Sequence, residues 1–354
     1  MQNKIESPPT GEAGATGGNE ANRPSFFRRF KWPLIILISI ILIGLLGLEG
    51  YHWLNNKKSV STTSTSTATD LKFDQPASSN DPFNDPNGPF YHKVYKDISP
   101  DGLNFTGKGE LVIDKASVPD VVKTNDGKLY IYAVDGGSRS KSGAMVAISS
   151  DNGTTWRQGS VQIKSEDSEM SVADPQAVLQ DDGSIRLFYL VASGLPDKKN
   201  GQPVSTNQGT FMIKSALSQD GVNFIEEKGI RYQSVGEQIT DPDVIKINNK
   251  WYMYLAKGSE LIATVSNDGN TFEFLQSIRN SGSVSKTVPI DNSQFRQYFC
   301  RDGISSATST DGLNWTDDPG IRIKQANNET VCDPSPVKID NAWLMIYKVE
   351  PAQK

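Results

Sequence analysis

From residue 90 to the end of the chain, short apolar runs alternate with polar turns. Runs such as 129–132 and 251–254 are rich in aromatic and aliphatic residues, which favour strands. A polar turn comes before each run, and before the turn stands an apolar segment with proline only near its start, where a strand tolerates it. The alternation therefore predicts a series of β-hairpins.

Two motifs recur along these hairpins at intervals of about 45 to 70 residues, which is the signature of a radial or stacked repeat. The first motif contains Ser, Asp and Gly and ends in Phe or Trp, and its copies contain Asp101, Asp151, Asp220, Asp268 and Asp311. The second motif opens a hairpin, and its copies contain Asp120, Asp174, Asp241 and Asp333. Aspartate followed by glycine suits a tight turn, because glycine adopts positive φ at no steric cost. We interpret the first motif as structural, and the two interleaved motifs predict four strands per repeat.

The ends of the repeat array predict how it closes. The last unit contains only two strands, at 331–339 and 343–349, whereas residues 90–113 stand before the first complete unit. Adding these N-terminal strands to the last unit completes a fifth sheet and removes an edge that would invite pairing with other chains. The sequence therefore predicts an all-β fold, a five-bladed β-propeller over residues 90–354. The fourth unit is degenerate, because residues 283–286 hold no aspartate.

An apolar segment at residues 31–53 precedes the repeats. Positions 33–48 carry no charge, and the segment is close to the ~20 residues that a bilayer requires. Three arginines stand just before it and Lys31 at its start, whereas two lysines follow it, so the positive-inside rule places the N-terminus in the cytoplasm. We expect a single transmembrane signal-anchor helix at the cell membrane, with the propeller extracellular or periplasmic. A cleaved signal peptide is the alternative, although no Ala-x-Ala site follows the run.

The other segments and the overall charge complete this organisation. Residues 1–30 are polar and predict a disordered cytoplasmic tail, and residues 54–89 are rich in Ser, Thr and Pro and predict a linker. A 36% hydrophobic composition agrees with one sizeable domain. The net charge of −5 gives no support for nucleic-acid binding, so no nucleic-acid partner is predicted.

The chain contains two cysteines, Cys300 and Cys332. The first ends the second strand of the fourth blade and the second begins the first strand of the fifth, so both lie on the same face of adjacent blades. Outside the cytoplasm they can form a disulfide. Two separately buried thiols are the alternative, because the sequence does not reveal the Cα separation that a bridge demands.

The candidate chemistry lies where the innermost strands begin. These strands run along the propeller axis, so their first residues ring one mouth of the central cavity. This arrangement predicts that four carboxylates converge there, with Asp243 nearby on the strand of Asp241: Asp120, Asp174, Asp241 and Asp333. Several carboxylates around one small pocket have separated pKa values, which suits one of them for acid and another for base work.

Basic residues are expected on the same rim, in loops that leave the second strands: Arg139, Lys257, Arg301 and Lys348. Together with Asp243 and Asp333, the two arginines and Lys257 are the predicted substrate-binding residues. Carboxylate oxygens also suit a structural Ca²⁺ ion on the axis, which is the one cofactor considered. The two histidines, His52 and His92, lie at the membrane edge and on an outer strand, so no histidine-based metal or nucleophilic site is predicted.

At these residues the chain, from about 90 to 350, resembles the five-bladed propeller glycosidases of glycoside hydrolase families 43, 32, 68 and 130. The Asp-Gly turns also look like the Asp-boxes of sialidases. The resemblance to family 43 implies that Asp120 is the general base, that Asp174 modulates the pKa of the acid, and that a third-blade Glu is the acid. This chain has Asp241-Pro242-Asp243 at the third blade instead. The acid is therefore one of these aspartates, or it is absent.

Three classes of function follow from these features. Together with the predicted anchor, the resemblance implies a membrane-anchored glycoside hydrolase-like propeller, or a glycan phosphorylase, acting on extracellular saccharide. The second class is a non-catalytic propeller that binds carbohydrate and keeps the carboxylates for structure or for sugar hydroxyl groups. The third is a structural or protein-interaction propeller. Turnover of a saccharide would separate the first class from the other two.

Overall fold

The computed structural model describes residues 70–166, 171–194, 209–325 and 329–351, and residues 68–354 form one compact unit. The first sheet contains β3 (Ala116–Lys123), β4 (Leu129–Asp135), β5 (Ala144–Ser149) and β6 (Arg157–Ser160). The second contains β8 (Ala173–Leu179), β9 (Ile185–Ser193), β10 (Thr210–Ser218) and β11 (Asn223–Glu226), with β7 (Gln162–Lys164) parallel to β11 and β12 (Tyr232–Val235) beside β10. The third contains β13 (Thr240–Ile247), β14 (Lys250–Lys257), β15 (Glu260–Ser266) and β16 (Glu273–Arg279).

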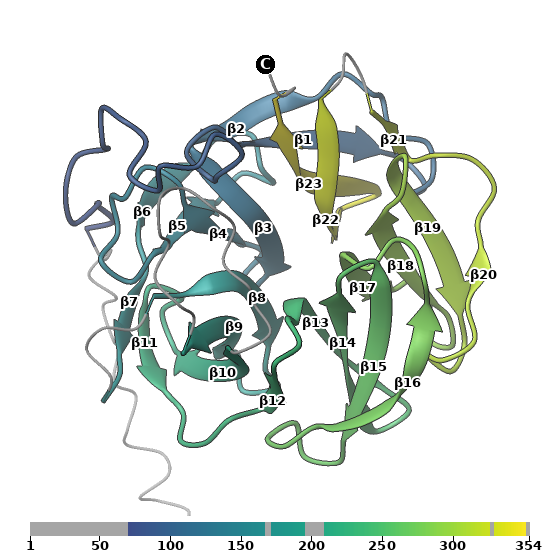
Figure 1. The fold of residues 1–354 in the computed structure, drawn as a ribbon. Helices are drawn as coiled ribbons and strands as arrows, with labels where there is room; N and C mark the ends of the chain where they lie inside the picture. Colours follow the sequence, from purple (N-terminus) through teal and green to yellow (C-terminus); the bar gives the residue numbers. More distant parts are fainter. Residues whose placement is uncertain (1–69, 167–170, 195–208, 326–328, 352–354) are drawn as a thin grey trace, which may run out of the picture. The chain divides into compact units, whose positions relative to one another are not determined.

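The remaining two sheets complete the ring. The fourth contains β17 (Ser285–Pro289), β18 (Phe295–Cys300), β19 (Gly303–Ser309), β20 (Thr316–Asp317) and β21 (Ile323–Lys324). The fifth contains β22 (Thr330–Ile339), β23 (Ala342–Glu350), β1 (Lys93–Ser99) and β2 (Glu110–Asp114). Figure 1 shows the five sheets arranged around one axis, with β3, β8, β13, β17 and β22 innermost. The predicted five-bladed β-propeller is therefore confirmed.

The N-terminal strands close the ring, as predicted. Strand β1 pairs with β23 along its whole length, from Lys93 opposite Val349 to Ser99 opposite Trp343, and β2 pairs with the other edge of β1. The last blade thus contains strands from both ends of the propeller sequence. No edge of β23 is left unpaired in this sheet.

The Asp-Gly turns fasten neighbouring blades together. In the turn at Asp311, the carboxylate accepts the backbone N–H groups of Leu313 and Asn314 at 2.8 Å each, and the Ser309 hydroxyl accepts the N–H of Gly312 at 2.9 Å. The carbonyl of each turn glycine accepts a hydrogen bond from the preceding blade, and the donors to Gly221, Gly269, Gly312, Gly102 and Gly153 are Tyr132, Arg186, Tyr254, Tyr298 and Lys96 respectively. These contacts agree with a structural role for the first sequence motif.

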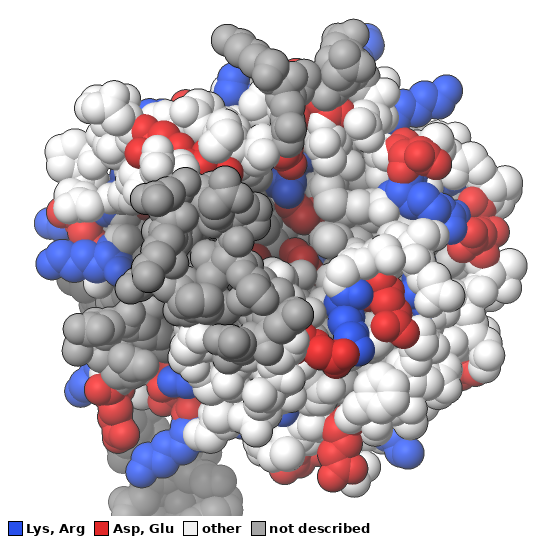
Figure 2. All heavy atoms as spheres, viewed as in Figure 1, with Lys and Arg blue, Asp and Glu red and all other residues white. Residues whose placement is uncertain are grey.

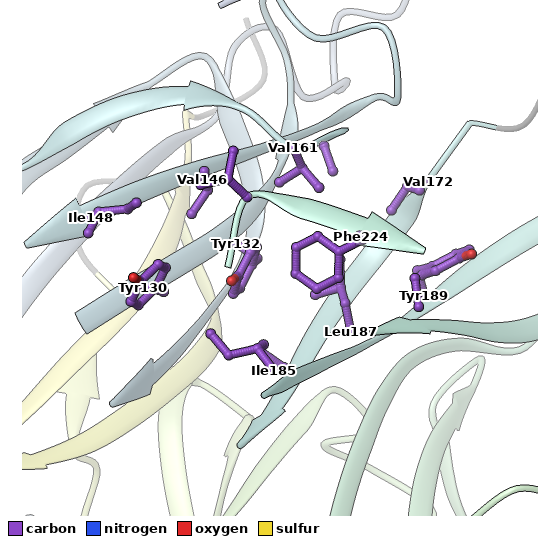
Figure 3. Packing of buried hydrophobic residues seen from close by; sticks show 14 of the residues in the cluster. Tyr130, Tyr132, Val146, Ile148, Val161, Val172, Ile185, Leu187, Tyr189 and Phe224 are labelled. Carbon is purple, nitrogen blue, oxygen red and sulfur yellow. The ribbon is translucent and has the colours of Figure 1, made fainter. Parts of the chain in front are cut away.

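Apolar side chains fill the wedge between adjacent blades. Figure 3 shows this packing between the first two blades, where the ring of Tyr132 meets the edge of Phe224 with centroids 5.7 Å apart. Leu187 and Ile185 from the second blade join the same cluster. Burying such aromatic and aliphatic surface is the main stabilising term for the ring.

Part of the predicted linker belongs to the propeller. Residues 70–80 lie along the first blade, where Ser160 donates its N–H to the carbonyl of Lys72 at 3.0 Å and Lys141 donates to the Asp74 carboxylate at 2.9 Å. Leu71 packs against the core between the first two blades. Leu71 and Phe73 are half-buried in these contacts, so this part of the predicted linker packs on the propeller. The tail at 1–30 and the apolar segment at 31–53 lie outside the described residues, and among the residues described there is no helix that could span a membrane.

A disulfide joins the fourth and fifth blades. Cys300 at the end of β18 and Cys332 near the start of β22 are bonded, with their Cα atoms 5.0 Å apart. Of the two alternatives that the sequence left open, the structure therefore has the bridge. The bond closes a loop between residues 32 positions apart and anchors the closing blade beside the central mouth.

Candidate functional site

Four of the five innermost strands begin with the same backbone irregularity. In each, the residue before a proline adopts positive φ, at 48° for Val118, 48° for Asp174, 51° for Asp241 and 50° for Asp333. The pairing register with the second strand shifts at each of these positions, which marks a β-bulge. Positive φ is uncommon for residues other than glycine, and bulges of this kind re-aim side chains next to functional sites.

The bulges direct three carboxylates to one mouth of the central channel. We call Asp174, Asp241 and Asp333 the rim carboxylates, and they line a small cavity of about 30 Å³, which has room for about two water molecules. Figure 2 shows acidic atoms at the bottom of the hollow in the centre of this face. Val118 occupies the corresponding position in the first blade, and Val284 lines the cavity from the fourth.

The rim carboxylates differ in charge environment. Burial raises the pKa of Asp174 to about 6, with a further rise from the nearby Asp333 charge, although the backbone N–H of Asp241 donates to Asp174 at 3.3 Å. Burial, followed by repulsion from Asp174, raises the pKa of Asp241 well above its ordinary value. The ammonium of Lys348 lies 2.9 Å from a carboxylate oxygen of Asp333. The site therefore holds one ion-paired carboxylate beside two carboxyls that compete for protons.

This arrangement predicts a pH-dependent stability. Because the pKa values of Asp174 and Asp241 are higher in the folded than in the unfolded chain, the folded state binds more protons than the unfolded state as pH rises from about 4. Stability therefore falls through the window up to about pH 6 set by Asp174, and Asp241, whose pKa is raised well above its ordinary value, adds to the fall. The variant carrying Asp174→Asn and Asp241→Asn should lose this dependence and should melt at a higher temperature than the wild type at pH 7.5. Thermal melting from pH 4.5 to 7.5 measures the effect. Parallel curves for variant and wild type would show that these carboxyls do not titrate as described.

A second layer lies two residues further along the innermost strands. It contains one side chain from each blade, all buried, and we call these residues the inner ring: Asp120, Gln176, Asp243, Lys286 and Ser335. Most of them bond to the neighbouring blade. Asp120 accepts the N–H of Ala177 at 2.7 Å, and Ser335 accepts the N–H of Val121 at 2.8 Å. These side chains therefore provide hydrogen-bond partners for backbone N–H groups at the strand edges that face the axis.

Asp120 belongs to this inner ring, not to the rim. Its carboxylate lies 2.6 Å from the Lys286 ammonium, which reaches it from the fourth blade across the axis, and it also accepts the Ser335 hydroxyl at 2.8 Å. Asp120 lines the same cavity as the other three motif aspartates, as the sequence predicted. The bulge of the first blade, however, puts Val118 at the position that they occupy, so Asp120 stands two residues further along its strand.

Asp243 has a similar structural environment. It is fully buried and accepts the backbone N–H of Thr287 at 3.0 Å and the Thr287 hydroxyl at 2.6 Å. Burial raises its pKa, while the charge of Lys286 acts to lower it. Asp243 thus holds the third blade against the fourth, and its oxygens are engaged by protein groups.

The predicted rim cations are all neutralised by carboxylates. Arg139 lies 2.8 Å from Asp135 and packs on the ring of Phe73, and Lys257 lies 2.8 Å from Glu237. Arg301 lies 2.6 Å from Asp317. Lys348 is paired with a rim carboxylate, Asp333, at 2.9 Å.

Comparison of the sequence with protein-family models and with curated proteins found no match. Comparison of the structure with solved structures found several glycoside hydrolases. A GH43 protein from Bacillus licheniformis matches with a TM-score of 0.51 and 14% identity, over 67% of this chain and 49% of that one, so the match spans about half of that protein. A family 117 glycoside hydrolase from Zobellia galactanivorans gives 0.44 and 13%, over 74% and 91% of the two chains. A GH32 β-fructofuranosidase from Bombyx mori gives 0.48 and 14%, over 73% and 58%.

The chain has the fold of the five-bladed propeller glycosidases. At such low identity the similarity concerns the fold alone, so residue roles in this glycosidase-fold propeller must come from its own site. The features of that site that could take part in a reaction are the bulged strand starts and the rim carboxylates. Ca²⁺ prefers several carboxylate oxygens close together, but within the described part of the chain the oxygens of the rim carboxylates do not all lie within 4.8 Å of one another, so this geometry gives the predicted ion no support.

Sequence reasoning missed two residues near the mouth of this propeller. Lys286 stands where the fourth unit lacks its aspartate, and a basic residue in a carboxylate position was the available signal. His92, expected on an outer strand, is buried just before β1, and its Nδ1 lies 2.8 Å from the hydroxyl of Ser117 beside Val118. Burial, with the charge of Lys348, lowers the pKa of His92 and favours its neutral form.

Proposed function

We propose that this propeller hydrolyses glycosidic bonds of a saccharide at the mouth formed by the rim carboxylates. The observation that carries the proposal is the neighbouring pair Asp174 and Asp241, whose raised pKa values allow one to hold a proton that the other releases. Asp241 acts as general acid to the leaving oxygen, and Asp174 acts as the base toward water. Asp333, which is paired with Lys348, accepts hydrogen bonds from sugar hydroxyl groups.

The cations of the site favour an uncharged sugar. A carboxylate or phosphate on the substrate needs a free Arg or Lys for a charge-assisted hydrogen bond. Among the described residues, each of the four predicted rim cations already has a carboxylate partner. The proposal is therefore hydrolysis of a neutral glycoside, in preference to an acidic one or to phosphorolysis.

A second candidate function is saccharide binding without turnover. It is favoured by Val118, which leaves the first blade without a rim carboxylate, and by the occupied oxygens of Asp120. In this alternative the rim carboxylates only accept hydrogen bonds from a sugar that rests above the small cavity.

A panel assay distinguishes the two candidates. The full chain is incubated with aryl glycosides of neutral and acidic sugars, with and without phosphate, and release of the aryl alcohol is measured. We expect release from a neutral glycoside, independent of phosphate. Calorimetric binding of a neutral oligosaccharide without any release would favour the binding propeller, and neither binding nor release would reject a saccharide site.

We also propose that the protein is anchored in the membrane with the propeller outside the cytoplasm. The charge asymmetry around residues 31–53 and the Cys300–Cys332 bond, which persists in oxidising compartments, support this location. Protease added to intact cells, or to spheroplasts for a periplasmic propeller, should remove the propeller while a tag before Met1 stays protected. A truncated product in the medium would support a cleaved signal peptide instead.

A further inference from the structure

The channel has a second cavity on the side of the inner ring away from the rim carboxylates. Its volume is about 490 Å³, and every innermost strand contributes to its walls, at residues 121–123, 177–181, 244–246, 287–289 and 336–338. Gln176 and Lys286 line both this lower cavity and the rim cavity, so the inner ring separates the two. A volume of a few hundred Å³ is typical of sites for small molecules.

The walls of the lower cavity are mainly apolar. Val122, Leu179, Ile245 and Val288 are half-buried: each packs against a core cluster on one side and lines the cavity with the rest of its surface. Trp251 and Trp343 also line it. Exposed apolar surface gathered in a concave site gains free energy when a ligand of the same character covers it.

The lysines of the lower cavity contrast with those of the rim. Lys123, Lys246 and Lys338 line it, and within the described part of the chain none of the three has a carboxylate partner. The Lys246 ammonium lies 5.8 Å from the centre of the Trp251 ring, which places a positive charge beside the apolar wall. Asp181 is the acidic residue among the described lining residues. The lower cavity therefore combines an apolar interior with an excess of unpaired positive charge.

We propose that the lower cavity binds a small amphiphilic anion, with an apolar aromatic or aliphatic body against the valines and tryptophans and a carboxylate or sulfonate at Lys246 or Lys338. This site is distinct from the proposed saccharide site. An apolar body without a charge would leave the lysines unpaired, and a small hydrophilic anion would leave the walls uncovered. Both parts of the ligand are needed for binding.

Titration calorimetry of the full chain with 1-naphthoate and with neutral 1-naphthamide tests this site. We expect naphthoate to bind more tightly than naphthamide. The variant with Lys246→Gln and Lys338→Gln should weaken naphthoate binding on the order of fivefold and bring it close to that of naphthamide. Val288→Trp, which fills the cavity, should abolish binding of both. Lys324→Gln, an exposed lysine outside the cavity, is the matched control.

Three outcomes would overturn the proposal. They are equal affinity of the wild type for the two compounds, unchanged naphthoate binding in the double lysine variant, and unchanged binding in a folded Val288→Trp variant. Glycoside turnover by the double lysine variant should equal that of the wild type. Failure of this site and failure of the proposed hydrolase activity are therefore separate results.

Discussion

The Asp241→Asn variant is expected to lose glycoside hydrolysis by a factor of about 10² or more, because asparagine cannot deliver a proton to the leaving oxygen. The fold should remain intact, since the amide keeps the shape of the side chain and removes a buried acid whose pKa is already raised. Initial rates on the best neutral aryl glycoside, with thermal melting of the same samples, measure both effects.

Asp302→Asn is the matched control for this experiment. Asp302 is exposed and adopts φ of 55°, a conformation that asparagine also tolerates, so the substitution removes one negative charge without removing a rim carboxylate. Its rate should equal that of the wild type. If Asp241→Asn and Asp302→Asn retain the same rate, Asp241 is not the acid.

The Asp120→Asn variant is expected to lose stability of the fold, while a folded sample keeps most of its turnover. The substitution leaves the Lys286 ammonium buried without its partner, and breaking one side of a buried ion pair costs about 3–5 kcal/mol. Urea denaturation should show a corresponding decrease in the free energy of unfolding. The loss of stability arises because the positive charge of Lys286 would remain buried among the five innermost strands without a carboxylate partner.

A second substitution tests that cause. Adding Lys286→Met to Asp120→Asn removes the unpaired charge while keeping a long side chain, so much of the lost stability should return. The single variant Lys286→Met should be destabilised as well. If the double variant is as unstable as the sum of both single variants, the two residues do not act as a pair.

The fold could be predicted because its signals are local and repeated. Each hairpin combines a polar turn with an aromatic strand, and each Asp-Gly turn fixes its own geometry through short-range hydrogen bonds such as those of Asp311. Closure by β1 followed from a missing pair of strands in the last unit. The packing of residues 70–80 on the first blade could not be predicted in this way, because the stretch has no repeat and only isolated apolar residues such as Leu71.

The site could be predicted only in part, because a bulge breaks the simple count of residues along a strand. Aligning the motif on aspartate put Asp120 beside Asp174, whereas alignment on proline puts Val118 there, as in the structure. All four motif aspartates do line the rim cavity, three of them from the bulge position. The partners of the basic residues, such as Asp317 for Arg301, depend on contacts between separate loops that no spacing reveals.

The central claim is that chemistry resides in the rim carboxylates while the inner ring holds the blades together. The most direct test compares turnover by Asp241→Asn and Asp120→Asn at a temperature where melting curves show both to be folded. The account predicts that Asp120→Asn keeps most of the wild-type rate and that Asp241→Asn loses it. Loss of turnover in folded Asp120→Asn, with activity retained in Asp241→Asn, would contradict it.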